Sequence, residues 1–154
     1  MLNPGIRANL RIGQRVNLGA AVSQPRVSRS RSSSSVARVA FAKVGANYRW
    51  GATGPYSFDC SGFSSYVMKQ MGATVPRSSR AQFNGGRAVS RNGLLPGDLV
   101  FFQGPSGRGG VGHVAVYIGG NRIIHASTPS TGVIVSSLSE RYFVGRYLGA
   151  RRYL

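Results

Sequence analysis

The chain has 154 residues, enough for one domain that buries its own hydrophobic core without disulfides or a structural metal. Its 20 lysine and arginine residues against three acidic residues give a formal net charge of +17. The single cysteine, Cys60, excludes an internal disulfide, and no spacing among the two histidines and three acids matches a zinc or calcium site. We therefore expect no metal and no cofactor.

Residues 1–35 are basic and end in the low-complexity run SRSRSSSS. Such a segment has almost nothing to bury, so we predict a disordered tail over 1–35 and a folded domain over 36–154. The tail contains no apolar run of the length that a secretory signal peptide needs. No stretch of the chain approaches the roughly 20 apolar residues of a membrane-spanning helix.

The folded domain is expected to begin with a helix and a nucleophile loop. In VARVAFAKVGA, residues 36–46, apolar side chains recur on one helical face until Gly45 ends the helix. The glycine- and proline-rich loop YRWGATGPYSFD then precedes Cys60, and GFSSYVMKQMG follows it with apolar residues at helical spacing. Cys60 should therefore lie at a helix start, with Asp59 as the N-cap. We interpret Trp50, in the loop, as a side chain that covers the edge of the core.

A helix start favours the thiolate form of a cysteine only weakly. The helix dipole contributes about 0.3–1 kcal/mol, and at best ~2 kcal/mol, which lowers the pKa of a thiol by about one unit. A working nucleophile at Cys60 would therefore need a base beside it.

Downstream of this helix the sequence predicts a short helix and several strands. PRSSRAQF, residues 76–83, indicates a loop that enters a helix capped by one of its serines. LLPGDLVFFQ indicates a tight turn and a strand, and Asp98 is expected to fix that turn through backbone hydrogen bonds. Further strands are predicted in the segments HVAVYIGG, RIIHAS, GVIVSSL and VGRYLGAR.

The two histidines lie in the two strands of a predicted hairpin, His113 in GHVAVYIGG and His125 in NRIIHAST. The register of this hairpin would bring the two imidazoles together on one face of the sheet. A thiol at a helix start and two imidazoles on rigid strands can act as nucleophile, base and orienting group. The alternative, from these residues alone, is a buried cysteine and two ordinary half-buried histidines.

Five segments follow one another along the chain: YRWGATGPYSFDCSGF, VPRSSRAQF, LLPGDLVFF, GHVAVYIGGNRIIHAST and GVIVSSL. In this order and at these separations they resemble the NlpC/P60 family of cell-wall cysteine peptidases, over about residues 36–148. The resemblance implies an α+β, papain-like fold, in which N-terminal helices that include the nucleophile helix pack on a central antiparallel sheet. It also implies that Cys60, His113 and His125 hydrolyse peptidoglycan stem peptides through an acyl-enzyme, and it points to the bond between D-γ-glutamyl and diaminopimelate or lysine.

The same resemblance implies a set of substrate-binding residues. It places Tyr48 at the border of the active site, Asp59 and Ser61 in a pocket for the free amine of the stem peptide, and Arg77 and Ser78 on the rim of the cleft. From the residues alone, capping of a helix is an alternative role for Asp59 or Ser61. A solvated polar loop is the alternative for Arg77 and Ser78, and coverage of the core edge is the alternative for Tyr48.

The positive charge favours an anionic partner, and bacterial cell walls with their phosphate-bearing polymers qualify. Nucleic acid is disfavoured as a partner because the charges are scattered and no nucleic-acid-binding motif is present. We expect a monomer that acts on peptidoglycan at the cell wall, whether secreted, released by a phage or carried on a virion. Two alternatives stay open: a related amidase or acyltransferase, and a non-catalytic protein that binds cell wall or nucleic acid.

Overall fold

The structure of the chain, a computed structural model, describes residues 24–105 and 109–154. Within the described residues, contacts make Ser32–Leu154 one compact unit. Every candidate site residue named above lies in this unit. Because residues 1–23 of the predicted tail lie outside the described residues, the predicted boundary between tail and domain stays a prediction.

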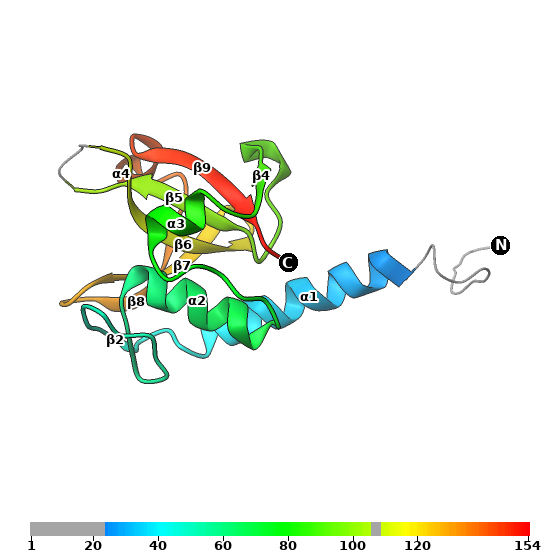
Figure 1. Ribbon diagram of the computed structural model, residues 1–154, viewed down its shortest axis with the longest axis horizontal. Coiled ribbons are helices and arrows are strands. Elements are labelled where there is room, and N and C mark those ends of the chain that lie inside the picture. Colours follow the sequence, from blue (N-terminus) through cyan, green and yellow to red (C-terminus); the bar gives the residue numbers. More distant parts are fainter. Residues whose placement is uncertain (1–23, 106–108) are drawn as a thin grey trace. The chain divides into compact units, whose positions relative to one another are not determined.

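The described elements are helices and strands, with most of the strands in the second half of the chain (Figure 1). In chain order they are α1 (Gln24–Phe41), β2 (Asn47–Tyr48), β3 (Ser57–Phe58), α2 (Cys60–Gln70), α3 (Ser79–Phe83), β4 (Arg87–Val89), the 3₁₀ turn η2 (Arg91–Gly93), β5 (Leu99–Gln103), β6 (Val111–Gly119), β7 (Arg122–Thr128), β8 (Gly132–Ser137), α4 (Arg141–Val144) and β9 (Tyr147–Arg152).

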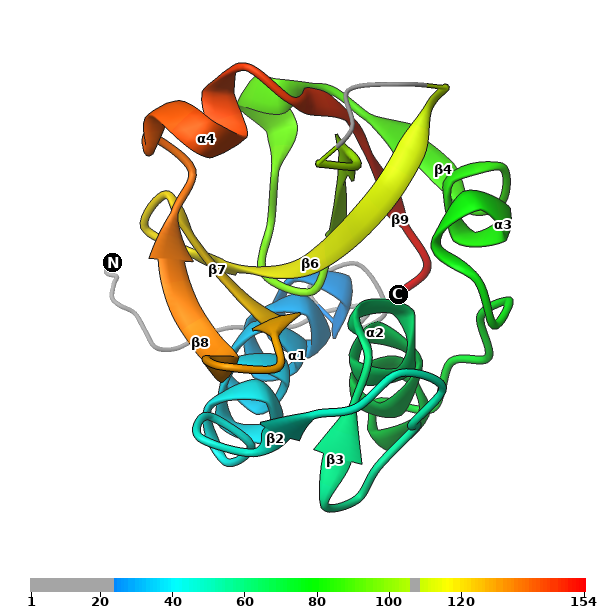
Figure 2. The ribbon, with the colours of Figure 1, turned by 90° about the vertical axis from the view of Figure 1, so that its left-hand side faces the viewer.

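Six of the strands form one antiparallel sheet in the order β4-β9-β5-β6-β7-β8. Strands β5 to β8 are neighbours both in the chain and in the sheet, whereas β9 returns to pair with β5 and so lies between β4 and β5. Strands β2 and β3 form a separate parallel pair before α2. Helices α2 and α4 lie on opposite sides of β6 (Figure 2).

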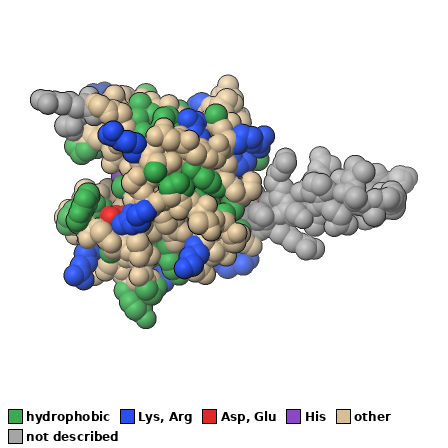
Figure 3. Space-filling model, in the orientation of Figure 1, with side chains coloured by type: hydrophobic (Ala, Val, Ile, Leu, Met, Phe, Trp, Pro, Cys, Tyr) green, Lys and Arg blue, Asp and Glu red, His purple; other side chains and the backbone are tan. Residues whose placement is uncertain are grey.

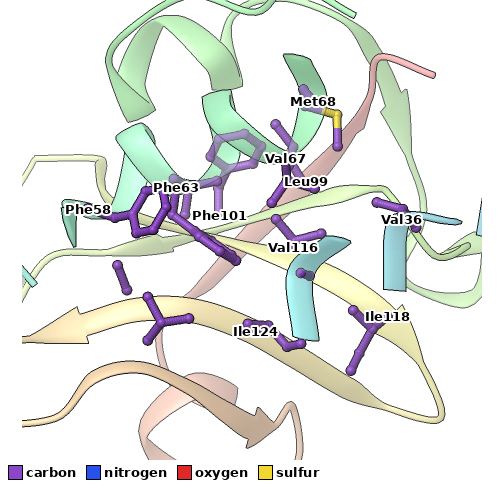
Figure 4. Packing of buried hydrophobic residues seen from close by; sticks show 14 residues of the cluster. Val36, Phe58, Phe63, Val67, Met68, Leu99, Phe101, Val116, Ile118 and Ile124 are labelled. Atoms are coloured by element: carbon purple, nitrogen blue, oxygen red, sulfur yellow. The ribbon is translucent and has the colours of Figure 1, made fainter. Parts of the chain in front are cut away.

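Two hydrophobic clusters cover the two faces of the sheet, because successive side chains of a strand point to opposite faces. The cluster under α2 combines residues of that helix with one set of strand residues, several of which are shown in Figure 4: Phe63, Val67, Met68, Leu99, Phe101, Val114, Val116 and Ile124. The cluster on the face of α4 contains the alternate set: Val100, Phe102, Ala115, Tyr117, Ile123 and Phe143. The sheet is therefore held in place from both sides.

The α+β architecture with an antiparallel sheet is confirmed, and so are the helix after Cys60 and the strands that follow Asp98. The first helix differs from its prediction, because it runs over Gln24–Phe41 instead of 36–46. It therefore includes residues 24–35, for which we predicted disorder. A run of Arg and Ser lacks apolar residues to bury, but neither residue type prevents a helix, since both cost well under about 1 kcal/mol in its interior.

Asp98 has the structural role predicted for it. Its Oδ2 accepts a hydrogen bond from the backbone N–H of Leu95 at 2.8 Å, which closes the turn before β5. Its Oδ1 is paired with Nε of Arg152 at 2.7 Å, and the carboxylate is almost fully buried. Asp98, which is far from Cys60 in the sequence, therefore links the turn before β5 to β9.

A buried glutamine connects α2 with the segment that leads to α3. Gln82 has no exposed surface. Its Nε2 donates to the carbonyl oxygens of Pro76 at 2.8 Å and Ser61 at 3.3 Å, while its Oε1 accepts from the hydroxyl of Ser64 at 2.7 Å. These hydrogen bonds all require the same orientation of the Gln82 side-chain amide. The amide therefore anchors the first turn of α2, which carries Cys60.

Replacement of this amide should destabilise the fold. Gln82→Leu keeps the volume but leaves buried polar groups without partners, at a cost of about 1–3 kcal/mol for each unsatisfied group. We expect the free energy of unfolding, measured by urea denaturation, to fall by about 2–4 kcal/mol. The matched control is Gln70→Leu at the exposed end of α2, with an expected change within about 0.5 kcal/mol. Equal effects of the two substitutions would contradict the anchoring role.

Candidate active site

Cys60 is the first residue of α2, and Asp59 is the N-cap, as predicted. The Asp59 carboxylate accepts a hydrogen bond from the N–H of Gly62 at 2.7 Å, within the first turn of the helix. It accepts a second from the N–H of Gly51 at 2.9 Å, in the loop that precedes the helix. One carboxylate thus fixes both the helix start and the loop against it, and the thiol lies between them in the chain.

The first turn of α2 packs so closely on this loop that only glycine fits at position 62. A Cβ added to Gly62 would overlap the carbonyl oxygen of Ala52, closer than real Cβ atoms approach any backbone atom. Nothing in the sequence pattern identified this contact, because the loop and the helix meet only in three dimensions.

The thiol of Cys60 is half-buried and packs against the cluster under α2. Burial raises the pKa of the Cys60 thiol above its ordinary value, and the negative charge of Asp59 adds to the rise. Hydrogen bonds from the backbone of Val114, on β6, and from the first turn of α2 act in the opposite direction but are outweighed. The predicted stabilisation of a thiolate by the helix start is therefore present but smaller than the effect of burial, and the resting group is a neutral thiol.

The two histidines meet, as the hairpin predicted. Nε2 of His113 lies 2.8 Å from Nδ1 of His125, and Nε2 of His125 lies 2.9 Å from the hydroxyl of Ser136 on β8. His125 is 2% exposed and Ser136 is 7% exposed. The three groups form a continuous chain of hydrogen bonds that crosses three strands.

The strand register explains why the two imidazoles meet. Tyr117 of β6 is paired with Ile123 of β7, so these two side chains point to the same face of the sheet. Two steps of two residues lead from Tyr117 to His113, and one such step leads from Ile123 to His125. Both imidazoles therefore point to the face of α4, where the ring of Phe143 packs edge-on against His125 at 5.3 Å.

Burial keeps both imidazoles uncharged. It lowers the pKa of His113 to about 4. Burial, with a smaller contribution from the neighbouring His113, lowers the pKa of His125 to about 3. At neutral pH His113 is therefore a neutral imidazole with a free lone pair, which is the form a general base requires.

A cavity of about 420 Å³ brings the thiol and the imidazoles together. It is lined by residues from the nucleophile loop, α2, β6, β7, β8 and α4: Tyr48, Trp50, Cys60, Pro105, Gly112, His113, His125, Ser127, Thr128, Ile134, Ser136, Glu140, Tyr142 and Phe143. The volume suits a short peptide segment. Chemically, the cavity offers one nucleophile, one base and one orienting group that face the same space.

Two aromatic residues of the nucleophile loop line this cavity. Burial raises the pKa of Tyr48, and the nearby Cys60 and Asp59 add to the rise, so its hydroxyl stays protonated and can donate a hydrogen bond. Trp50 is 86% exposed. The interpretation of Trp50 as a cover for the core edge was wrong, because its side chain is exposed and lines the cavity instead.

The remaining predicted residues form a polar cluster beside the start of α2. Arg77 donates through Nη2 to Oδ2 of Asp59 at 2.8 Å and through Nη1 to the hydroxyl of Ser61 at 2.7 Å. Burial alone would raise the pKa of Asp59, but hydrogen bonds from Arg77, Gly62 and Gly51 outweigh it and hold that pKa below its ordinary value. The carboxylate therefore stays ionised, with its charge already balanced by the guanidinium.

Ser78 caps a helix in the structure. Its hydroxyl accepts a hydrogen bond from the N–H of Ala81 at 3.1 Å, at the start of α3. Among the described residues that line the cavity, Asp59, Ser61, Arg77 and Ser78 do not occur. Their predicted part in substrate binding stays a prediction.

Sequence reasoning missed the residues that complete the cavity from the C-terminal part of the chain. Ser136 lies on β8, Glu140 precedes α4 as its N-cap, and Phe143 lies on α4. The segment GVIVSSL contains Ser136, but nothing in its pattern indicated a contact with His125. In the part of the chain that the structure describes, no group of three or more metal-ligating side chains occurs. The same part contains no helix with the length and apolar character required to cross a bilayer.

A helix-borne thiol beside strand-borne imidazoles on an antiparallel sheet is the arrangement of papain-like proteins. The model of the NlpC/P60 family matches residues 45–152. The crystal structure of an NlpC/P60 family protein from Bacillus cereus superposes with a TM-score of 0.75 at 38% identity, over 79% of this chain and 40% of that one. The chain belongs to the NlpC/P60 family.

Two curated relatives are similar in sequence. Gamma-D-glutamyl-L-lysine dipeptidyl-peptidase from Bacillus cereus is 41% identical over 111 residues, which is 72% of this chain and 33% of the relative. Murein DD-endopeptidase MepS/murein LD-carboxypeptidase from Escherichia coli is 46% identical over 112 residues, which is 71% of this chain and 57% of the relative. The chain therefore spans between a third and somewhat more than half of the length of these relatives.

The buried imidazoles make the stability of the fold sensitive to acid. Because the folded-state pKa of His125 is about 3 and its ordinary value is 6.5, the unfolded chain binds more protons between these values. Stability is thus fully present above about pH 6.5 and decreases as the pH falls toward 3. Urea denaturation should show a loss of up to about 1.4 kcal/mol per pH unit for a buried imidazole between pH 6 and 4. In His125→Gln, the free energy of unfolding should depend less steeply on pH. An unchanged pH dependence would contradict the assignment of this effect to the buried imidazole of His125.

Proposed function

We propose that the chain is a cysteine endopeptidase that hydrolyses peptidoglycan stem peptides. The single observation that carries the proposal is one cavity that contains the thiol of Cys60 and a hydrogen-bonded pair of neutral imidazoles, His113 and His125. A thiol alone could be structural, and so could a buried imidazole pair. Their meeting in an open cavity gives a nucleophile and its base a common substrate space.

The proposed reaction starts with a proton transfer from Cys60 to His113. Because Nε2 of His113 faces His125, the other nitrogen, Nδ1, is the one left to take the proton of the thiol. The thiolate attacks the scissile carbonyl carbon and the protonated imidazole then gives its proton to the leaving amine, so that an acyl-enzyme forms, which water hydrolyses. The backbone N–H of Cys60 and the hydroxyl of Tyr48 are the proposed donors to the oxyanion.

His125 and Ser136 would hold His113 in the tautomer that this reaction needs. If Nδ1 of His113 is to accept a proton, its Nε2 must carry the hydrogen and donate to Nδ1 of His125. His125 then carries its own hydrogen on Nε2 and donates it to the hydroxyl of Ser136. The two hydrogen bonds, of 2.8 and 2.9 Å, thus keep the hydrogen of each imidazole on Nε2. This arrangement gives His125 the orienting part that a carboxylate or amide plays in other triads.

The names of the relatives support peptidoglycan as the substrate and give three different activities. The Bacillus cereus relative is named for the γ-D-glutamyl-L-lysine bond, and the Escherichia coli relative for DD-endopeptidase and LD-carboxypeptidase activities. We propose the bond between D-γ-glutamyl and a diamino acid, diaminopimelate or lysine. We also propose that the chain acts as a monomer at the bacterial cell wall, where its net charge of +17 favours anionic polymers.

Digestion of purified muropeptides tests the proposal directly. Mass spectrometry of the products identifies the bond that is cleaved, and a muramyl–alanine cut or an acyl transfer product would favour a related amidase or acyltransferase. Cys60→Ala should lower kcat/KM by at least about 1000-fold, and His113→Ala by a similar factor. His125→Ala should retain more activity, because it removes the orienting group but leaves nucleophile and base in place.

Two measurements make this test decisive. Lys69→Ala, an exposed change in the last turn of α2, is the matched control and should stay within about twofold of the wild type. Sedimentation with cell-wall sacculi should show that Cys60→Ala still binds. Full lytic activity in Cys60→Ala would reject the enzyme and favour a non-catalytic cell-wall or nucleic-acid-binding protein.

The pH dependence of the reaction should show the low pKa of the base. Because burial lowers the pKa of His113 to about 4, the imidazole stays neutral well below its ordinary value of 6.5. We expect kcat/KM to remain above half of its maximum down to about pH 5.5. Assays at constant ionic strength, with activity checked after return to pH 7, separate this effect from acid unfolding. A half-maximum at pH 6.5 or above would contradict the assignment of His113.

A further inference from the structure

The cavity contains one charged side chain that the proposed reaction does not use. Glu140 lies between β8 and α4, as the N-cap of α4, and lines the same cavity as Cys60 and His113. Its Oε2 accepts a hydrogen bond from the N–H of Ser137 at 3.0 Å, so the carboxylate is held at the end of β8. Its other oxygen is not used in this hydrogen bond. The side chain of Glu140 is therefore held in place by this hydrogen bond and is also exposed to solvent.

Glu140 differs electrostatically from the two other acids of the chain. Asp59 is paired with Arg77 at 2.8 Å, and Asp98 with Arg152 at 2.7 Å. Among the described residues, Glu140 has no lysine or arginine within ion-pair distance, although basic side chains are spread over the visible face of the molecule (Figure 3). In a chain with a net charge of +17, a carboxylate without such a partner leaves its negative charge available to a ligand.

Within the cavity this charge has no counterpart. Glu140 is the one lysine, arginine, aspartate or glutamate among the described residues that line it, and the imidazoles there are neutral. Asp59 lies on the side of α2, whereas Glu140 lies with Ser136 and Phe143 on the side of β8 and α4. A peptide over Cys60 would therefore meet an unbalanced carboxylate at the wall formed by β8 and α4.

The residues beside Glu140 suit an alkyl chain that ends in a cation. Ile134 and Tyr142 line the cavity together with Glu140 and offer apolar surface, although the guanidinium of Arg146 covers one face of the Tyr142 ring at 4.0 Å. Methylene groups gain from contact with such surface, while a terminal ammonium gains from a carboxylate held at its end. This is the side-chain chemistry of lysine. It does not match an acidic residue or a side chain without net charge, such as that of diaminopimelate, which ends in an ammonium and a carboxylate.

We propose that Glu140 binds the side-chain ammonium group of a lysine in the stem peptide and thereby sets a preference for a cationic residue beside the scissile bond. The inference rests on the proposed function, because it requires that the cavity takes such a peptide. It adds a specificity-determining residue that acts by charge, separate from the nucleophile and the two imidazoles. An exposed ion pair is weak, so the preference should be modest, about three- to fivefold in kcat/KM.

Two peptides that differ only in this charge test the inference. One is L-alanyl-γ-D-glutamyl-L-lysine, and the other carries norleucine in place of lysine, which removes the ammonium and keeps the alkyl chain. We expect the wild type to prefer the lysine peptide by about three- to fivefold at low salt. Glu140→Gln keeps an oxygen for the N–H of Ser137 and should bring the ratio of the two kcat/KM values to about 1. Glu140→Lys should reverse the preference.

A matched control and a third peptide distinguish a direct contact with the side-chain ammonium from indirect effects of Glu140. Arg141→Gln changes a neighbouring exposed charge outside the cavity and should leave the ratio unchanged within about twofold. If Glu140→Gln slows both peptides equally, Glu140 only supports the turn between β8 and α4, and the inference is overturned. If the Glu140 effect disappears when the alanine amine is acetylated and persists with norleucine, the bound ammonium is the terminal one, which also overturns it. If the wild type cleaves neither peptide, the proposed function itself fails.

Discussion

The site depends on one carboxylate at the start of α2. Asp59 accepts hydrogen bonds from Gly62 in the helix, from Gly51 in the loop before it and from Arg77 in the segment after it. The start of α2 and the segments before and after this helix are thereby fixed around Cys60. The charge of Asp59 is balanced by a guanidinium, so this buried anchor is stabilised where it would otherwise be costly.

The antiparallel sheet supplies the other half of the site through its alternation. One set of side chains packs on α2, which carries the thiol, and the opposite set carries both imidazoles and packs on α4. Val114 belongs to the first set and His113 to the second, as adjacent residues of β6. The strand β6 thus contacts the nucleophile helix through the backbone and side chain of Val114, while the adjacent residue, His113, supplies the base.

The sequence alone predicted what depends on local pattern. Asp59 as the N-cap, the helix after Cys60 and the hairpin of His113 and His125 all follow from neighbours within a few residues. It did not predict Ser136 or Glu140, because their parts depend on how β8 and the chain after it reach the cavity. It also misjudged Trp50, since an indole is more often buried than exposed and nothing local shows which surface it meets.

The burial of the imidazole pair has a consequence for the whole surface. With pKa values of about 4 and about 3, neither histidine gains or loses a charge between about pH 5 and 8. The side-chain charge of the molecule is then nearly constant over the range in which most proteins with exposed histidines change theirs. Long-range attraction between this cationic molecule and an anionic matrix would be governed by ionic strength, whose screening length is about 10 Å at 0.1 M, while acidity would leave it almost untouched.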